Sequence, residues 1–301
     1  MIEARAFDPQ VLAWLERLAL GIQRSRSIRV GERSVGRIQG VGIEPENFRN
    51  YAPGDDLRFL DWNVFARLDD LVTRTYRATR QIEITVLVDS SASMGAPYED
   101  DKLGLALLLA AALAYIAICD NNSARLVCFS RTRGGLHVQA SPFCRRLETY
   151  PDLRPFVTAV RSRGDTALDE GVAAFLSERR PAGLAILISD FLVDAAEYES
   201  ALARLLTAGF ETKAIHVMGE RESTGSFEAG LCMLRDAESG ERRELVMAGE
   251  AIELYRAKVA ELAQRLAGFC TRHAIAYAQA FGVASFERVM TRELPRLGVI
   301  R

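Results

Sequence analysis

Five side chains with oxygen donors, drawn from three separate stretches of the sequence, have the chemistry to hold a hard divalent cation together. The first stretch ends an apolar run in a D-x-S-x-S pattern, the second supplies a loop threonine, and the third ends another apolar run in an aspartate. The five residues are Asp89, Ser91, Ser93, Thr166 and Asp190. Because every donor is an oxygen atom, the set favours Mg²⁺, then Mn²⁺ or Ca²⁺, and excludes a zinc-type site of histidine and cysteine.

The charge of this set leaves a bound cation free to take one more ligand. Two aspartates roughly cancel the charge of a divalent ion, whereas the serine and threonine hydroxyls are neutral donors. The ion therefore keeps Lewis acidity for one further anionic oxygen, from water or from a carboxylate of a partner protein. The structural alternative is that Asp89 and Ser91 only cap a helix that begins near residue 101.

The elements that position these residues are predicted to be strands and helices in alternation. Near-continuous apolar runs are typical of strands covered on both faces, and alternation with helices predicts an α/β fold with a doubly wound, mostly parallel sheet. Ligands bind such a sheet at the carboxyl ends of its strands, so Asp89 and Asp190 meet there if their strands are neighbours. The predicted strands are 82–88, 124–129, 135–140, 184–189, 212–218 and 275–281, and the predicted helices are 101–119, 166–179, 195–208 and 249–273.

Other segments depart from this alternation. Apolar residues at helical spacing predict an N-terminal helix over 8–21, and the polar, glycine-containing stretch 22–58 indicates extended chain and turns before a strand at 71–76. A short loop at 130–135 predicts that the strands flanking it pair as an antiparallel hairpin. A second hairpin, near 228–247, is predicted at the surface as an insertion before the last long helix.

Composition excludes several classes of protein. A net charge of −2 over 301 residues argues against general nucleic-acid binding. The five cysteines are odd in number and form no C-x-x-C pair, which indicates a reducing compartment, and we expect a cytoplasmic protein. The apolar run 103–119 is at the short limit for a membrane span. Its alanine content and its place directly after the D-x-S-x-S loop predict a buried helix instead.

Enzymatic functions lack residues that they need. A phosphatase similar to the haloacid dehalogenases, with Asp89 as nucleophile, would need a second acid two residues later, where Ser91 stands. The sequence has no G-x-S-x-G elbow for a serine hydrolase and no Walker A sequence for ATP hydrolysis, and its only histidines are His137, His216 and His273. We therefore expect no enzymatic activity, and a metal-dependent phosphohydrolase using Asp89 is the main alternative.

The five-residue pattern resembles the metal-ion-dependent adhesion site of the von Willebrand factor type A domain, which combines D-x-S-x-S with a separate loop threonine and a separate aspartate. An upstream segment resembles the signature of the bacterial family called domain of unknown function 58. Its residues are Arg49, Tyr51, Gly54, Asp55, Asp56, Arg58, Asp61, Trp62 and Arg67. Within it, Arg58 and Arg67 could form bidentate pairs with the aspartates, and Trp62 with Phe59 could anchor the segment on the sheet.

These resemblances imply an organisation and a function. The family joins its signature to a von Willebrand A-like domain, so we divide the chain into an N-terminal helix and signature segment, 1–80, and that domain, 81–301. Many members carry two transmembrane helices before the signature, and none is visible here. The resemblance implies a metal that captures a partner's acidic side chain. It also implies a MoxR-class AAA+ ATPase as partner, with a role as adaptor or co-chaperone in assembling or maturing another complex. A metal-free scaffold using the arginine-rich segment 22–37 is a further alternative.

Overall fold

The computed structural model divides the chain into two compact units. It describes residues 5–18, 27–30, 43–53, 57, 60–79, 81–96, 100–225, 230–296 and 298–300. The larger unit consists of Met1–Ile22 and Ile82–Arg301, and the smaller of Gln23–Gln81. We grouped the N-terminal helix with the signature segment, but α2 (Pro9–Leu15) belongs to the larger unit. Its Leu15 is fully buried in the same apolar core as the sheet residue Val86.

A central sheet organises the larger unit. Among the described residues its six strands run in the order β11-β8-β7-β4-β5-β6, and all neighbours are parallel except β5 and β6, which form the antiparallel hairpin expected from their short loop. The strands are β4 (Glu83–Asp89), β5 (Ser123–Thr132), β6 (Gly135–Ala140), β7 (Leu184–Ser189), β8 (Glu211–Met218) and β11 (Ala276–Phe281). The predicted fold class, an α/β fold with a doubly wound and mostly parallel sheet, is confirmed.

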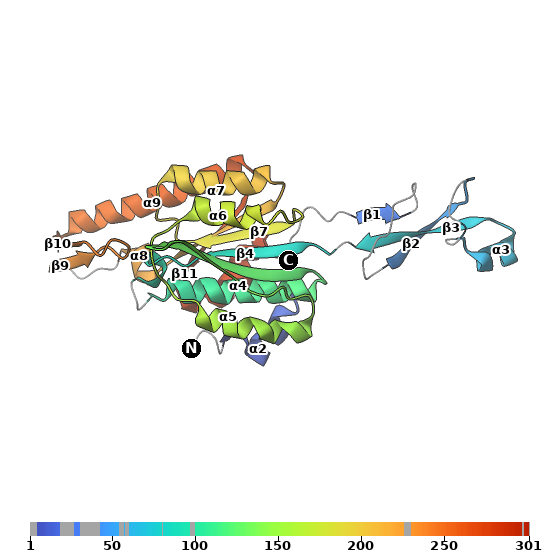
Figure 1. The fold of residues 1–301 in the computed structure, drawn as a ribbon, viewed down its shortest axis with the longest axis horizontal. Coiled ribbons are helices and arrows are strands. Elements are labelled where there is room, and N and C mark those ends of the chain that lie inside the picture. The colour runs from blue at the N-terminus through green and yellow to red at the C-terminus, as the bar shows by residue number, and fades with distance from the viewer. Residues whose placement is uncertain are drawn as a thin grey trace. The chain divides into compact units, whose positions relative to one another are not determined.

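Helices cover both faces of this sheet, and each face has its own apolar core. Successive residues of a strand point to opposite faces, so Val86 and Val88 of β4 enter one core and Leu87 enters the other. Figure 1 shows α2, α4 and α5 on the first face and α6, α7 and α9 on the second. Their bounds are α4 (Lys102–Cys119), α5 (Arg154–Ala159), α6 (Leu168–Ser177), α7 (Ala195–Thr207) and α9 (Gly249–Arg272).

Helix α4 is long and apolar enough to cross a membrane by length and composition, yet 94% of it is buried inside the larger unit. Its residues pack against β4 and β5 from one face of the sheet. The segment directly before it turns through η2 (Ser93–Gly95), and Asp101 caps the helix by accepting a hydrogen bond from the Gly104 amide at 3.1 Å. The run 103–119 is therefore the core helix expected after the D-x-S-x-S loop.

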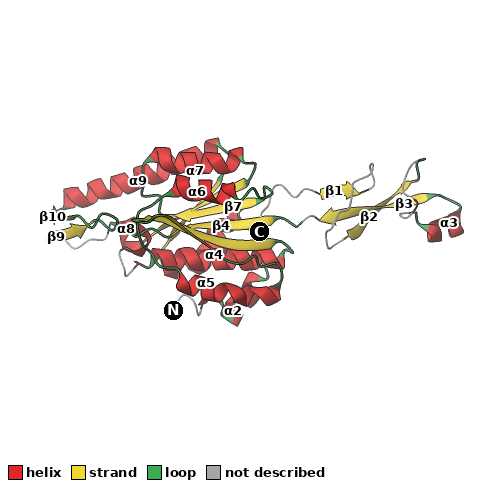
Figure 2. Cartoon of the chain, viewed as in Figure 1, coloured by secondary structure: helices red, strands yellow, loops and turns green. Residues whose placement is uncertain are grey.

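Short elements complete the larger unit. The segment between β6 and α6 forms η4 (Leu147–Leu153) and then α5. A hairpin of β9 (Gly230–Arg235) and β10 (Arg242–Met247) occupies the segment predicted near 228–247 (Figure 2). The remaining elements are α8 (Glu220–Thr224), η5 (Val283–Ser285), α10 (Phe286–Arg288), the π-helix η6 (Val289–Glu293) and α11 (Leu294–Arg296).

The smaller unit is an antiparallel sheet with one short helix. Its described strands have the order β1-β3-β2, where β1 is Ser27–Val30, β2 is Ile43–Asn50 and β3 is Val72–Thr79. The helix α3 (Trp62–Leu68) begins at Asp61, whose carboxylate accepts hydrogen bonds from the Asn63 and Val64 amides at 3.0 and 3.3 Å. We expected extended chain over 22–58 and did not predict α3, because a helix of two turns leaves no periodic pattern to detect.

Candidate metal centre

Asp89, the last residue of β4, lies fully buried at the carboxyl edge of the sheet. Its Oδ1 accepts a hydrogen bond from the Ser91 amide at 2.9 Å, and its Oδ2 accepts one from the Ser189 hydroxyl at 2.7 Å. Burial and, next, the negative charge of Asp190 at the end of the neighbouring strand together raise the pKa of Asp89 to about 7, although these hydrogen bonds lower it. The edge therefore holds two buried carboxylates at close quarters, an arrangement that a cation would stabilise.

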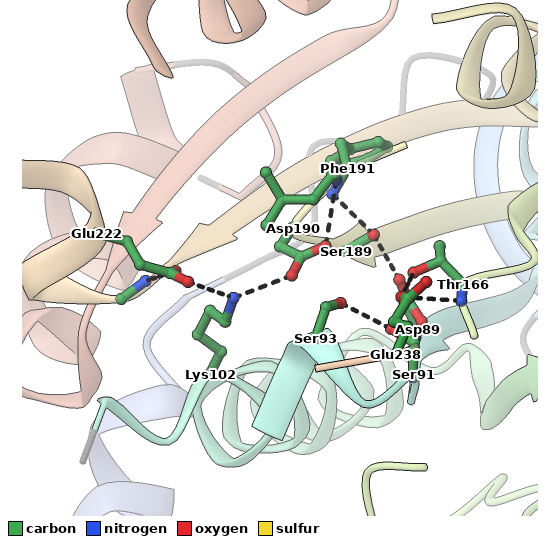
Figure 3. Close-up of polar contacts among 12 residues, drawn as sticks. Asp89, Ser91, Ser93, Lys102, Thr166, Ser189, Asp190, Phe191, Glu222 and Glu238 are labelled. Atoms are coloured by element: carbon green, nitrogen blue, oxygen red, sulfur yellow. Dashed lines mark hydrogen bonds and ion pairs between the residues drawn. The ribbon is translucent and has the colours of Figure 1, made fainter. Parts of the chain in front are cut away.

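The two serines of the D-x-S-x-S loop bring their hydroxyls together. Ser91 Oγ and Ser93 Oγ are 3.0 Å apart (Figure 3). The loop is not simply extended, since Ser93 begins the turn η2. Gly95 ends that turn with its Cα packed directly against the Ser162 side chain, so that any Cβ at this position would collide with it. A glycine is thus needed where the first loop of the site meets the second.

The second loop, residues 162–166, is joined to the first by backbone hydrogen bonds. The Ala92 amide donates to the Gly164 carbonyl at 2.8 Å, and the Arg163 amide donates to the Ser90 carbonyl at 2.9 Å. Gly164 has φ +69°, in the left-handed region, and a Cβ there would strike the Arg131 carbonyl. The tight bend before Thr166 therefore depends on glycine for two separate reasons.

Thr166 receives a carboxylate from a distant part of the chain. Its Oγ1 donates a hydrogen bond to Glu238 Oε1 at 2.6 Å, and its amide donates to the same oxygen at 3.0 Å. Glu238 lies at the tip of the β9–β10 hairpin, 72 residues further along the sequence. Burial raises the pKa of Glu238, and the charges of Asp165 and Asp190 add to the rise. The two hydrogen bonds from Thr166 lower this pKa but do not cancel the rise.

Asp190 follows β7 and pairs with a buried lysine. Lys102 Nζ lies 3.0 Å from Asp190 Oδ2 and 2.9 Å from Glu222 Oε1, and the Lys102 and Asp190 side chains are each only 1% exposed. Burial lowers the pKa of Lys102, but the two carboxylates have the larger combined effect, so the pKa of Lys102 is raised. The Leu192 amide also donates to Asp190 Oδ1, at 3.3 Å. Asp190 is therefore held firmly in place beside Asp89.

Four polar residues of this site were not predicted from the sequence: Ser189, Lys102, Glu222 and Glu238. Lys102 left the clearest signal, because it is a lone charged residue at the start of an otherwise apolar helix. Ser189 directly precedes Asp190 at the end of an apolar strand, where a polar side chain also draws attention. Glu222 and Glu238 stand in polar, exposed-looking stretches, and nothing in those stretches marks them as site residues.

The donors that the structure brings together fit a hard divalent cation. Four carboxylates, from Asp89, Asp190, Glu222 and Glu238, are linked through this network, and Lys102 is its single ammonium among the residues described. Within the same part of the chain, no group of three His, Cys, Asp or Glu side chains could hold a metal by itself. A cation at this edge would therefore need hydroxyls as part of its coordination, and such an all-oxygen set suits Mg²⁺ and not zinc.

The other residues singled out in the sequence lie elsewhere. His216 is fully buried beside Phe191, with its Nδ1 2.8 Å from the Tyr277 hydroxyl, and burial lowers its pKa to about 4. Of the signature residues, Trp62 begins α3 and is 60% exposed there, and its anchoring of the segment on the sheet stays a prediction. Its ring contacts Phe65, with centroids 6.3 Å apart.

The rest of the signature is described only in part. Tyr51 is half-buried, and its amide donates to the Leu71 carbonyl at 2.8 Å. Asp61 caps α3, and Arg67 is exposed in the last turn of that helix. Arg49 belongs to β2, with its side chain outside the described atoms. Gly54, Asp55, Asp56, Arg58 and Phe59 lie outside the described residues, as does the arginine-rich segment 22–37 except for 27–30.

Comparison with known proteins places the chain in a family. A family model described as protein of unknown function DUF58 matches residues 47–265. The uncharacterized proteins Mb1516 of Mycobacterium bovis and Rv1480 of Mycobacterium tuberculosis are each 32% identical to it over 254 residues, which are 81% of this chain and 76% of theirs. The chain is also similar to two solved structures.

These structures are conserved hypothetical protein BatB from Bacteroides thetaiotaomicron and a von Willebrand factor type A protein from Catenulispora acidiphila. The first is 17% identical with a TM-score of 0.43, over 72% of this chain and 98% of BatB. The second is 14% identical with a TM-score of 0.39, over 73% of this chain and 43% of that protein. The family expected from the signature is confirmed by the model match and the mycobacterial relatives, and the chain belongs to the family described as protein of unknown function DUF58.

Proposed function

We propose that this chain is a metal-dependent protein–protein interaction module. In this proposal Asp89, Ser91, Ser93, Thr166 and Asp190 hold Mg²⁺, with Mn²⁺ or Ca²⁺ able to replace it. The observation that carries the proposal is the hydrogen bonding of the D-x-S-x-S loop to the loop of Thr166, through Ala92 and Arg163, at the edge where Asp89 meets Asp190. Three chain segments thereby present oxygen donors at one place.

The ion would supply an electrophilic centre at the surface of the domain. Asp89 and Asp190 are fully buried, whereas Ser93 and Thr166 are partly exposed, so the donor set opens to solvent on its hydroxyl side. A partner that presents an aspartate or glutamate from that side would complete the coordination with a charged oxygen. Neutral hydroxyls on the open side favour such a ligand, because they do not repel its charge.

The family resemblance suggests what the partner is. We propose a MoxR-class AAA+ ATPase in the cytoplasm, with this chain acting without catalysis of its own as an adaptor or co-chaperone in the assembly or maturation of another complex. The geometry favours a binding role over a nucleophilic one, since Asp89 is fully buried and both of its carboxylate oxygens already accept hydrogen bonds.

Metal binding is the first step to test. Isothermal titration of the purified chain with Mn²⁺ and Mg²⁺ should give one site, and Asp89→Ala should abolish it. Asp152→Ala, which removes an exposed aspartate in η4, is the matched control and should bind like the wild type. Absence of any binding by the wild-type chain would overturn the metal-dependent function and favour the metal-free scaffold.

The partner is tested by co-purification. A MoxR-class ATPase expressed from the same host should be retained by the immobilised chain in Mg²⁺, and lost with chelator or in Asp89→Ala. Incubation with p-nitrophenyl phosphate and Mg²⁺ provides the opposing outcome. Turnover that depends on Asp89 would replace the interaction module with a phosphohydrolase.

A further inference from the structure

The tip of the β9–β10 hairpin reaches the candidate metal centre. Asp236 organises the tip by accepting hydrogen bonds from the Glu238 and Ser239 amides, both at 2.8 Å. This turn directs the Glu238 side chain to Thr166, whose hydroxyl and amide both donate to Glu238 Oε1. Figure 3 shows the Glu238 carboxylate drawn beside Thr166. A carboxylate from within the chain thus lies on the open, hydroxyl side of the site.

The position of this carboxylate is unfavourable without a cation. Glu238 is half-buried, and it interacts with two like charges, those of Asp165 and Asp190. A carboxylate at the tip of a surface hairpin can usually turn into solvent and avoid such repulsion. Two hydrogen bonds to Thr166 hold it here instead, and a divalent ion among these oxygens would reverse the sign of its electrostatic interaction with the site.

Apolar packing is a poor explanation for the hairpin's place. Paired residues Leu231 and Val246 are 74% and 65% exposed, and Met233 is 56% exposed. A two-stranded hairpin is marginally stable by itself, so the polar contacts of its tip become an important part of what fixes it on the domain. The tip can therefore leave the site without breaking an apolar core.

A cavity of about 530 Å³ adjoins the Thr166–Glu238 contact and leaves room for such movement. Its walls are part acidic and part apolar, and it opens beside the side on which we place the partner's carboxylate. It is lined by Thr166, Leu192, Val193, Asp194, Glu197, Glu238 and Leu262.

From these contacts we infer that Glu238 is an internal ligand of the metal centre, occupying the coordination position that a partner's acidic side chain takes in the proposed function, on which this inference rests. The partner's carboxylate then binds by displacing the hairpin tip. The site is self-occupied in the free chain, and a partner must compete with a carboxylate that is tethered beside the metal.

Inner-sphere water on bound Mn²⁺ tests this inference, measured by the relaxation rate of water protons in the metal-loaded chain. Glu238→Ala removes the ligand, so the variant should gain about one bound water, and its Mn²⁺ affinity should fall by about tenfold or more. Acetate should then occupy the freed position in Glu238→Ala and lower the relaxation rate again, at concentrations that leave the wild-type rate unchanged.

Two further variants separate ligation from charge and from folding. Glu244→Ala removes an exposed carboxylate from strand β10 of the same hairpin, and it should behave like the wild type. Glu238→Gln keeps an oxygen that can accept the Thr166 hydrogen bonds but loses the charge, so its acetate response should lie between those of Glu238→Ala and the wild type.

The outcomes distinguish this inference from the function on which it rests. If Mn²⁺ binds the wild type and Glu238→Ala with equal affinity and equal hydration, Glu238 is not a ligand, while the metal centre stands. If Glu238→Ala and Glu244→Ala change alike, the effect is one of general charge and the inference also fails. If the wild type binds no Mn²⁺ at all, the proposed function itself is overturned.

Discussion

The buried ion pair of Lys102 offers the sharpest test of the charge balance at the site. In Lys102→Met the side chain keeps its length but loses the ammonium that contacts Asp190 at 3.0 Å and Glu222 at 2.9 Å. Lys102 and Asp190 are each 1% exposed, so water does not replace the lost contact. Removing one partner of a buried pair in this way destabilises a protein by about 3–5 kcal/mol, and the unpaired Asp190 carboxylate is also repelled by the neighbouring Asp89.

The assay is urea unfolding followed by circular dichroism in the presence of chelator. The free energy of unfolding of Lys102→Met should be lower than that of the wild type by about 3–5 kcal/mol. The slope of this free energy against urea concentration should not change. Lys258→Met is the matched control, since Lys258 Nζ also lies 2.9 Å from a carboxylate, that of Glu261, but is 70% exposed. Its unfolding midpoint should match that of the wild type.

A double variant shows whether the cost comes from the unpaired charge. Lys102→Met combined with Asp190→Asn removes both charges of the closest pair, so it should recover part of the stability lost in the single variant. Two results would refute this reasoning. One is a change below about 1 kcal/mol in Lys102→Met. The other is a double variant whose loss in free energy of unfolding equals the sum of the losses in the two single variants.

Three further outcomes follow from the same structure. Mg²⁺ at about 100 times its dissociation constant should raise the free energy of unfolding by about 2.7 kcal/mol, measured by thermal melts, and should leave Asp89→Ala unchanged. Gly164→Ala should destabilise the chain by about 1–3 kcal/mol in urea because of its positive φ, whereas Gly134→Ala, with no close neighbour, should not. Burial raises the pKa of Cys270 to about 12, so its thiol should react with dithionitrobenzoate only after unfolding, while the partly exposed Cys232 on the hairpin reacts in the native chain.

The strands of the central sheet were predictable because both of their faces are covered. Strand β7 has the bounds predicted for it, 184–189, and every one of its residues is buried. A segment with no exposed face carries mostly apolar side chains, so its pattern is clear in the sequence. The polar residues that end such runs are then conspicuous, which is how Asp89 and Asp190 were found.

The smaller unit was harder to predict for the opposite reason. The sequences of β1 and β2 contain charged and polar residues such as Arg29 and Glu44, without the long apolar runs of the central sheet. Their pairing with β3 is a long-range property, since β1 and β3 are separated by more than 40 residues. Local pattern does not report on such pairing, and the stretch was therefore interpreted as extended chain and turns.

The residues that join the site through contacts with residues far away in the sequence were not predicted. Lys102 meets Asp190 across 88 positions and Glu222 across 120, and Thr166 meets Glu238 across 72. The D-x-S-x-S loop was recognisable because three of its donors are local to one another. Glu238 has no such local pattern, because its role depends on where the hairpin tip comes to lie and not on its own neighbours in the sequence.

In the proposed function, an acidic ligand suits this site because the donors divide into buried carboxylates and the partly exposed hydroxyls of Ser93 and Thr166. Asp89 and Asp190 lie on the protein side, where Lys102 already offsets part of their charge. If Ser93 or Thr166 were a carboxylate instead, the open side would carry the negative charge that repels an incoming acid. With hydroxyls there, an ion at this edge presents its positive charge outward. The side chain on that open side is an acid, Glu238. An acid is the ligand expected there, so the hairpin and the proposed metal centre are best understood as one unit.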